Sequence, residues 1–159
     1  MTREFSHLDE TGGISMVDVG SKRVTVREAV AVATVRMKPE TLTKLVEQAL
    51  PKGDVLTTAK VAGVLAAKQT PNLIPLTHPV PISSVDITFD LDRGAGTIEV
   101  RGIVRCEAKT GVEMEAMTAA AVAALTIYDM CKSAEKGISI ETLQLVRKSG
   151  GKSGLWERS

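Results

Sequence analysis

Three short clusters in the sequence carry side chains that can bind anions or transfer protons. Lys52, in KGD, directly precedes a predicted helix, whose first N–H groups and dipole favour an anion. His78 lies in LIPLTHPVPIS, between two prolines. Asp129 and Lys132, in YDMCK, share one face of a predicted helix, where a lysine with an altered pKa can act as an acid or a base. Taken singly, each cluster also has an ordinary explanation: an exposed loop lysine, a histidine bonded to the backbone, and a surface ion pair.

Two carboxylates stand close together in EME, where Glu113 and Glu115 flank a methionine. Residues two apart in a helix point about 200° apart at 3.6 residues per turn, so these carboxylates are not a paired acid and base. Glu113 has the capping-box spacing from Thr110. This spacing predicts that Glu113 caps the helix that follows.

A glycine-rich segment near the C-terminus, KSGGKSG, adds Lys148 and Lys152. The backbone N–H groups of such a segment can wrap an anion. The segment is not a P-loop, because Val146 stands where that motif has its first glycine. The alternative interpretation is a flexible basic tail, which covers residues 149–159.

Prolines predict a rigid, non-helical strap around His78. Each proline fixes its own φ and biases the residue before it toward extended conformations. Four of the six prolines in the chain lie here: Pro71, Pro75, Pro79 and Pro81. The strap is either a plain connector or a support that holds His78 at a fixed angle toward a ligand.

Hydrophobic periodicity predicts the elements that must position these clusters. In chain order they are a strand over 24–37, helices over 39–50 and 55–68, a hairpin within 83–109, a helix over 111–137 and a strand over 138–148. Asp54 is expected to cap the second helix, and Gly137 to end the third. This order predicts an α+β, ferredoxin-like sandwich in which an antiparallel sheet carries its helices on one face. The alanine-rich third helix predicts close backbone packing on its own sheet or on another subunit.

Composition and charge limit the class of protein. The 159 residues, 43% of them hydrophobic, suit a single domain over 1–159, with 1–15 as a mobile N-terminal arm. The net charge of +1 gives no broad electrostatic footprint for nucleic acid or a membrane. Cys106 and Cys131 form neither a disulfide framework nor a CxxC metal pair, and no metal site is predicted. With no signal segment and no membrane-length apolar span, the sequence predicts a cytoplasmic protein.

Seven motifs, in order along nearly the whole chain, carry a family resemblance. They are MVDV (16–19), KGDV (52–55), AAK (66–68), LIPLTHP (73–79), KTGVEMEA (109–116), ALTIYDMCK (124–132) and KSGGKSG (148–154). Together they resemble the MoaC family of molybdenum-cofactor biosynthesis proteins. One departure is Thr77, where the family often has cysteine, and this argues against a required thiol.

The resemblance implies a lyase, a cyclic pyranopterin monophosphate synthase. Such an enzyme rearranges the cyclic dihydroguanosine triphosphate made from GTP and releases diphosphate. A triphosphate needs local positive charge, while ring opening, ring closure and phosphate cyclisation need proton transfer but no redox cofactor. Whether Mg²⁺ accompanies the triphosphate stays open. The family is hexameric, as a trimer of dimers, so we expect a homo-oligomer with pockets at subunit contacts.

The resemblance also assigns site residues. Asp129 matches the family's catalytic acidic residue, and we expect Lys52 and Lys132 to act as acid and base beside it, in an order that the sequence leaves open. Substrate binding is expected from Leu76, Thr77, His78, Glu113, Met114, Glu115, Lys68 and Arg27. The last two rest on shorter motifs, AAK and TVREA.

A second class of protein stays open, a non-catalytic ferredoxin-like module that senses purine nucleotides, because such sheets host many functions. RNA binding by such a sheet normally uses exposed aromatic side chains, and only 3% of the residues are aromatic. A GTP cyclohydrolase-like enzyme would call for zinc, for which two distant histidines without clustered cysteines are poor ligands. Turnover separates the enzyme from the sensor, because a sensor leaves a purine triphosphate unchanged.

Overall fold

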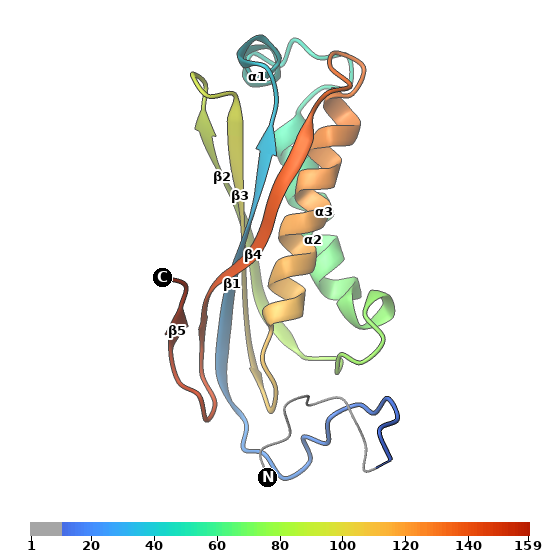
Figure 1. The fold of residues 1–159 in the computed structure, drawn as a ribbon, viewed down its shortest axis with the longest axis vertical. Helices are drawn as coiled ribbons and strands as arrows, with labels where there is room; N and C mark the ends of the chain where they lie inside the picture. The colour runs from blue at the N-terminus through green and yellow to red at the C-terminus, as the bar shows by residue number, and fades with distance from the viewer. Residues whose placement is uncertain (1–10) are drawn as a thin grey trace.

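A computed structural model describes residues 11–159, which fold into one antiparallel sheet and three helices (Figure 1). The elements in chain order are β1 (Thr25–Arg36), α1 (Pro39–Val46), α2 (Val55–Leu73), β2 (Ile82–Asp92), β3 (Thr97–Ala108), α3 (Glu113–Cys131), β4 (Ser139–Ser149) and β5 (Trp156–Glu157). Most of the N-terminal arm that we expected to be mobile lies outside the described residues.

The sheet has the strand order β2-β3-β1-β4-β5, with every neighbouring pair antiparallel. The first four strands have the order of a ferredoxin-like sandwich, and the helices cover one face of the sheet, as the sequence predicts (Figure 1). Ala29, Ala31 and Ala33 on β1 are fully buried beneath these helices. β5 comes from the segment expected to be a flexible tail, and it pairs with β4 through Lys148 and Trp156.

Small residues bring α3 against its own sheet and against α2. Gly102 on β3 and Gly63 on α2 both face the α3 backbone, where an added Cβ would lie 2.8 Å from the Ala116 carbonyl oxygen and 2.9 Å from that of Ala119. The alanine-rich face of α3 is thus used within the chain. The expectation that no segment has the length and apolar composition of a membrane span is wrong, because α3 has both, although it packs as a core helix here.

Three local predictions about the helices are wrong. Pro71 lies inside α2, so the strap begins only at Ile74. A proline in the last turn removes a single helical hydrogen bond, and the Ile74 N–H still donates to the Thr70 carbonyl. Glu113 does not cap α3, because Val112 is the N-cap residue and makes no side-chain cap bond.

The end of α3 also differs from the prediction. The helix stops at Cys131 rather than at Gly137. The N–H groups of Ala134 and Glu135 both donate to the Cys131 carbonyl, which closes the helix in a turn before the chain reaches the glycine. By contrast, Asp54 caps α2 as expected, because its carboxylate accepts the Thr57 N–H at 3.0 Å.

Gln48 occupies a position that favours glycine, and replacing it should stabilise the fold. It follows α1 with φ of 53°, in a Schellman motif in which its N–H donates to Leu45 and the Ala49 N–H donates to Lys44. A side chain in the left-handed region is costly, so Gln48→Gly should raise the free energy of unfolding by ~0.5 to 1 kcal/mol. Urea denaturation measures this change.

The matched control makes the same replacement where the backbone is helical. Gln69 lies on the exposed face of α2, and Gln69→Gly should lower the free energy of unfolding by ~1 kcal/mol. If both variants lose stability, the left-handed conformation of Gln48 carries no strain.

Candidate active site

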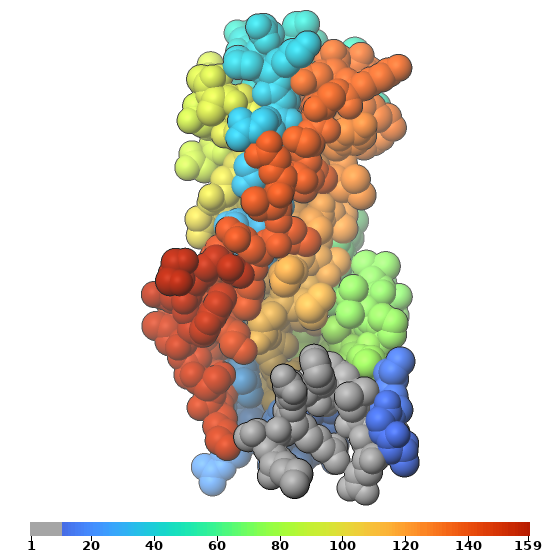
Figure 2. Space-filling model, viewed as in Figure 1, coloured from blue at the N-terminus to red at the C-terminus, as the bar shows by residue number. Residues whose placement is uncertain are grey.

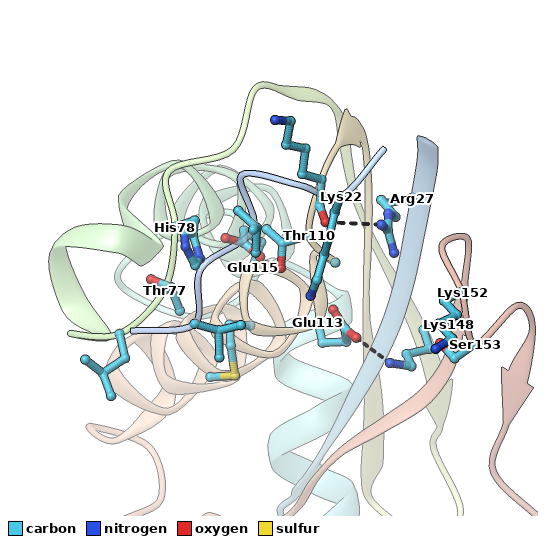
Figure 3. Close-up of a pocket in the computed structure, with 16 residues that line it drawn as sticks. Lys22, Arg27, Thr77, His78, Thr110, Glu113, Glu115, Lys148, Lys152 and Ser153 are labelled. Atoms are coloured by element: carbon cyan, nitrogen blue, oxygen red, sulfur yellow. Dashed lines mark hydrogen bonds and ion pairs between the residues drawn. The ribbon is translucent and has the colours of Figure 1, made fainter. Parts of the chain in front are cut away.

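A cavity of about 840 Å³ opens at the end of the sandwich where α3 begins (Figure 3). Its walls come from the segment before β1, the start of β1, the strap, the β3–α3 loop, the first turn of α3, the end of β4 and the C-terminal tail. Five of the lining residues are cationic: Lys22, Arg27, Lys109, Lys148 and Lys152. Because the net charge of the whole chain is only +1, this positive charge is a local feature of the cavity.

The strap forms one wall of the cavity and presents Leu76, Thr77 and His78 to it (Figure 3). The Thr77 hydroxyl donates to the Ile74 carbonyl at 2.9 Å, which ties the strap to the end of α2. The half-buried His78 ring makes no hydrogen bond to any residue in 11–159. The structure therefore does not support a histidine satisfied by the backbone, and the ring is available to a ligand.

The carboxylates of Glu113 and Glu115 line the same cavity although they leave α3 in different directions. Glu113 accepts a hydrogen bond from the Lys148 Nζ at 2.7 Å, and this ion pair joins the first turn of α3 to β4 (Figure 3). Glu115 is only 2% exposed, and burial, assisted by the charge of Glu113, raises its pKa above the ordinary value. A buried carboxylate that has no cationic partner lowers the stability of the folded protein, unless a bound ligand supplies the partner.

Glu115→Gln should stabilise the protein in a pH-dependent way. Because its pKa is raised in the folded state, the folded chain holds this proton more tightly than the unfolded chain does. Stability is therefore lost as pH rises from the ordinary glutamate pKa through the raised one. Glutamine cannot ionise, so the melting temperature of the variant minus that of the wild type should be larger at about pH 7 than at about pH 4.

The control for this pH dependence is Glu107→Gln, because Glu107 is an exposed glutamate on β3. For this variant, the curve of melting temperature against pH should run nearly parallel to the wild-type curve across the same pH range. A Glu115→Gln curve that also runs parallel to the wild type would show that burial does not perturb this carboxyl group.

Arg27 reaches the cavity, whereas Lys68 does not. The Arg27 guanidinium donates to the carbonyls of Ala108 and Lys109, at 3.4 and 3.3 Å, so it is fixed against the β3–α3 loop. Lys68 lies on the exposed face of α2 and is not among the residues that line the cavity. Within one chain, seven of the eight expected substrate-binding residues thus come together.

Not every cation of the cavity is predicted from the sequence. Lys148 and Lys152 stand out in the tail without a predicted role, and nothing singles out Lys22. The Lys109 Nζ donates to the Gly20 carbonyl at 2.6 Å and ties the segment before β1 to the β3–α3 loop. The motif KTGVEMEA begins at Lys109 and was the one available signal.

A second charged cluster lies at the opposite end of α3. Asp129 accepts a hydrogen bond from the Lys52 Nζ at 2.9 Å and another from the Lys132 Nζ at 2.6 Å, and Lys52 also donates to the Asp129 backbone carbonyl. The bond from Lys132, followed by that from Lys52, lowers the pKa of Asp129 to about 2. Asp129 in turn raises the pKa of Lys132. The structure thus brings Lys52, Asp129 and Lys132 together.

The cavity and this cluster are far apart within one chain. Glu115 and Asp129 lie near the two ends of α3, and their separation along the helix corresponds to about 21 Å at 1.5 Å per residue. A proton-transfer group acts over about 3 Å. A ligand in the cavity of one chain is therefore out of reach of the Asp129 cluster of that same chain.

Within residues 11–159, neither the cysteines nor the acidic residues form a further reactive centre. Cys106 and Cys131 are buried, and burial raises the pKa of Cys131 to about 11, which leaves it an inert thiol. Across residues 11–159, no group of three or more histidine, cysteine, aspartate or glutamate side chains is placed to hold a metal ion.

The ferredoxin-like sandwich and its cation-lined cavity define a small α+β domain suited to a phosphorylated ligand. The model of the MoaC family matches residues 16–151, and the chain belongs to the MoaC family. It is similar to "Cyclic pyranopterin monophosphate synthase" of Geobacter sulfurreducens, at 56% identity over 97% of this chain and 96% of the relative. Proteins of the same name from Desulfatibacillum aliphaticivorans and Chloroflexus aurantiacus are 54% and 52% identical, over 95% and 98% of this chain and 95% of each relative.

Proposed function

We propose that this chain is a cyclic pyranopterin monophosphate synthase of molybdenum-cofactor biosynthesis. It is a lyase that converts the cyclic dihydroguanosine triphosphate derived from GTP into cyclic pyranopterin monophosphate and releases diphosphate. The observation that carries the proposal is the cavity, in which five cations surround a strap and a buried carboxylate. The cations suit the phosphate groups, and the polar groups of Thr77, His78 and Glu115 suit the purine-derived rings.

Proton transfer is assigned to Lys52 and Lys132, which both donate to Asp129. Lys132 has a raised pKa, so it stays protonated at neutral pH and begins the reaction as a proton donor. Asp129 stays ionised and keeps both ammonium groups in place. Opening of the purine-derived ring and closure of the pyranopterin ring each need a proton moved at a defined atom, which two placed lysines supply.

A complete site requires two copies of the chain. The cavity and the Asp129 cluster lie about 21 Å apart along α3, so one substrate cannot contact both halves of a single copy. If a second copy brings its Asp129 cluster to the mouth of the cavity, every assigned residue meets the substrate. This arrangement agrees with the homo-oligomer expected from the family resemblance, a hexamer built as a trimer of dimers.

The remaining assignments follow from the chemistry. The rearrangement is not a redox reaction, so no redox cofactor is required, and Mg²⁺ enters only as a companion of the triphosphate, held by phosphate oxygens. The partner is a small molecule rather than nucleic acid or a membrane, since five cations line one cavity and the net charge of the chain is only +1. The cytoplasm is the proposed compartment.

The decisive experiment is incubation of the purified protein with the cyclic dihydroguanosine triphosphate. The expected product has the mass of cyclic pyranopterin monophosphate, becomes a fluorescent pterin on oxidation, and appears together with one equivalent of diphosphate. GTP itself serves as the control substrate and should remain unchanged. Binding of the cyclic triphosphate without product would instead identify the protein as a nucleotide-sensing module.

A further inference from the structure

The last residues of the chain fold back on the sheet and hold a loop against the cavity. The loop joins β4 to β5, and Lys152 and Ser153 in it line the cavity wall next to Lys148 (Figure 3). In the space-filling view, the dark red C-terminal residues form one flank of the molecule (Figure 2). The cavity therefore depends for one wall on a short and otherwise exposed segment.

Glycines allow this loop to turn back tightly. Gly150 and Gly151 both have positive φ, at 97° and 72°. A Cβ atom on Gly150 would overlap the Val26 carbonyl, and one on Gly151 would overlap the Arg27 guanidinium. The loop thus lies directly on the start of β1 and on a cation of the cavity. A glycine-rich loop of this kind has many alternative conformations, so its position must be fixed from outside.

The fixing contacts come from Glu157 and Arg158. β5 pairs with β4, and the Glu157 carboxylate forms an ion pair with the Arg147 guanidinium, with 3.2 Å between Oε1 and Nε. The Arg158 N–H donates to the Val146 carbonyl at 2.9 Å, and its Nε donates to the Leu145 carbonyl at 2.8 Å. The Arg158 guanidinium also lies over the Trp156 ring, 5.8 Å from its centroid. We call residues 156–158 the C-terminal clasp.

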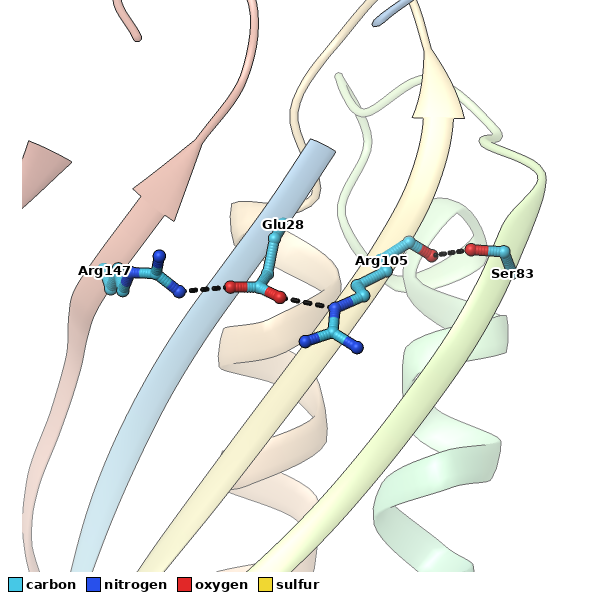
Figure 4. A network of polar contacts seen from close by, with 4 residues as sticks. All are labelled: Glu28, Ser83, Arg105 and Arg147. Carbon is cyan, nitrogen blue, oxygen red and sulfur yellow. Dashed lines mark hydrogen bonds and ion pairs between the residues drawn. The ribbon is translucent and has the colours of Figure 1, made fainter. Parts of the chain in front are cut away.

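The clasp is anchored on the helix-free face of the sheet, opposite the cavity. Arg147 binds Glu28 on β1, which also binds Arg105 on β3 (Figure 4). The Glu28 side chain is only 13% exposed, so this anchor is held within the sheet. Because side chains alternate along a strand, Arg147 points to this face while its neighbour Lys148 points to the cavity and binds Glu113. The clasp therefore influences the cavity without touching a ligand in it.

We propose that Glu157 and Arg158 are positioning residues that hold Lys152 and Ser153 at the phosphate-binding wall of the cavity. This rests on the proposed function for the identity of the ligand, a triphosphate whose product is diphosphate. The clasp raises the fraction of molecules in which the loop stands in its binding position. Apparent affinity for a ligand falls in proportion to that fraction, so loss of the clasp weakens phosphate binding.

The test compares the wild type with Glu157→Gln and with a chain that ends at Leu155. For both variants KM for the cyclic triphosphate should rise about three- to ten-fold while kcat stays within about two-fold, because the Asp129 cluster is untouched. The dissociation constant for inorganic diphosphate, measured by calorimetry, should rise by the same factor. The melting temperature of Glu157→Gln should change by no more than ~2 °C, since an exposed ion pair contributes little to stability.

Two comparisons separate positioning from a general structural effect. Glu141→Gln removes another exposed ion pair of β4, with Arg36 at the other end of the strand, and should leave KM unchanged. In a Lys152→Ala background, Glu157→Gln should have little further effect on diphosphate affinity, because the residue through which it acts is gone. Glu157→Asp keeps the carboxylate and should restore most of the affinity.

The proposal is overturned if the chain ending at Leu155 binds diphosphate as tightly as the wild type, or if the Glu157→Gln effect is as large without Lys152 as with it. A fall in kcat at constant KM would also contradict it. The diphosphate titration needs no turnover, so it tests the clasp even if the wild type leaves the cyclic triphosphate unchanged. That latter result would contradict the proposed function alone.

Discussion

Lys52→Ala and Lys132→Ala are each expected to lower turnover of the cyclic triphosphate by ~10² to 10⁴-fold, the usual cost of losing a positioned proton-transfer group. Both lysines donate to the exposed carboxylate of Asp129, and neither lies in the core. The two variants should therefore fold and assemble as the wild type does. The effect should appear in kcat rather than in KM, because the proposed phosphate-binding residues line the cavity at the other end of α3.

The matched control is Lys60→Ala. Lys60 is an exposed lysine of α2 that pairs with Asp86 at 2.7 Å, so its replacement removes the same side chain and a similar ion pair away from both halves of the site. Turnover should stay within about two-fold of the wild type, since surface pairs contribute little. Near wild-type rates for both Lys52→Ala and Lys132→Ala would move the chemistry to Glu113, Glu115 or the tail lysines.

The fold was predictable from the sequence because its local signals agree with its global packing. On β1, alanine and valine alternate, so one face is small and fully buried under the helices, and the period of two identifies the strand. Asp54 is an N-cap residue in both sequence and structure. The order of elements then leaves few arrangements, and the ferredoxin-like strand order is among them.

Contacts between distant parts of the chain account for what the sequence did not reveal. Glu113 has the spacing of a capping residue, but Lys148 approaches from β4 and takes its carboxylate. Lys22 carries no local signal, and Lys109 has only its place at the start of the motif KTGVEMEA. Both belong to the cavity because the segment before β1 is bonded to the β3–α3 loop. Pro71 sits in the last turn of α2, where a proline is tolerated better than its local preference indicates.

The division of the site between two ends of the molecule follows from topology. The short helix α1 lies at one end of the sandwich together with both of its connections, and the other successive elements run in opposite directions, so the remaining connections alternate between the two ends (Figure 1). The strap before β2 and the loop before α3 fall at one end, and the loop with Lys52 and the end of α3 fall at the other. Element order therefore predicts which motifs meet, whereas the spacing of motifs along the sequence does not.

The second large effect is recovery of activity when two inactive variants are mixed. One variant carries Lys52→Ala, and the other carries His78→Ala with Lys148→Ala in the cavity. If each site combines the cavity of one copy with the Asp129 cluster of another, co-assembly in equal amounts should leave about one site in four intact, with a wild-type cavity facing a wild-type cluster. Activity should then recover to about a quarter of the wild-type rate from parents that are each nearly inactive.

The control mixture combines Lys52→Ala with Lys132→Ala. These two lysines bind the same Asp129 carboxylate, so they belong to one half of the site, and every mixed assembly still lacks one of them in each cluster. This mixture should show no recovery. Recovery in the first mixture and not in the second requires that the two halves come from different copies, because a site contained in one chain cannot be repaired by a neighbour. Equal failure of both mixtures, with co-assembly verified by mass spectrometry, would contradict the two-copy site and would require α3 or the strap to move far enough to bring both halves together in one chain.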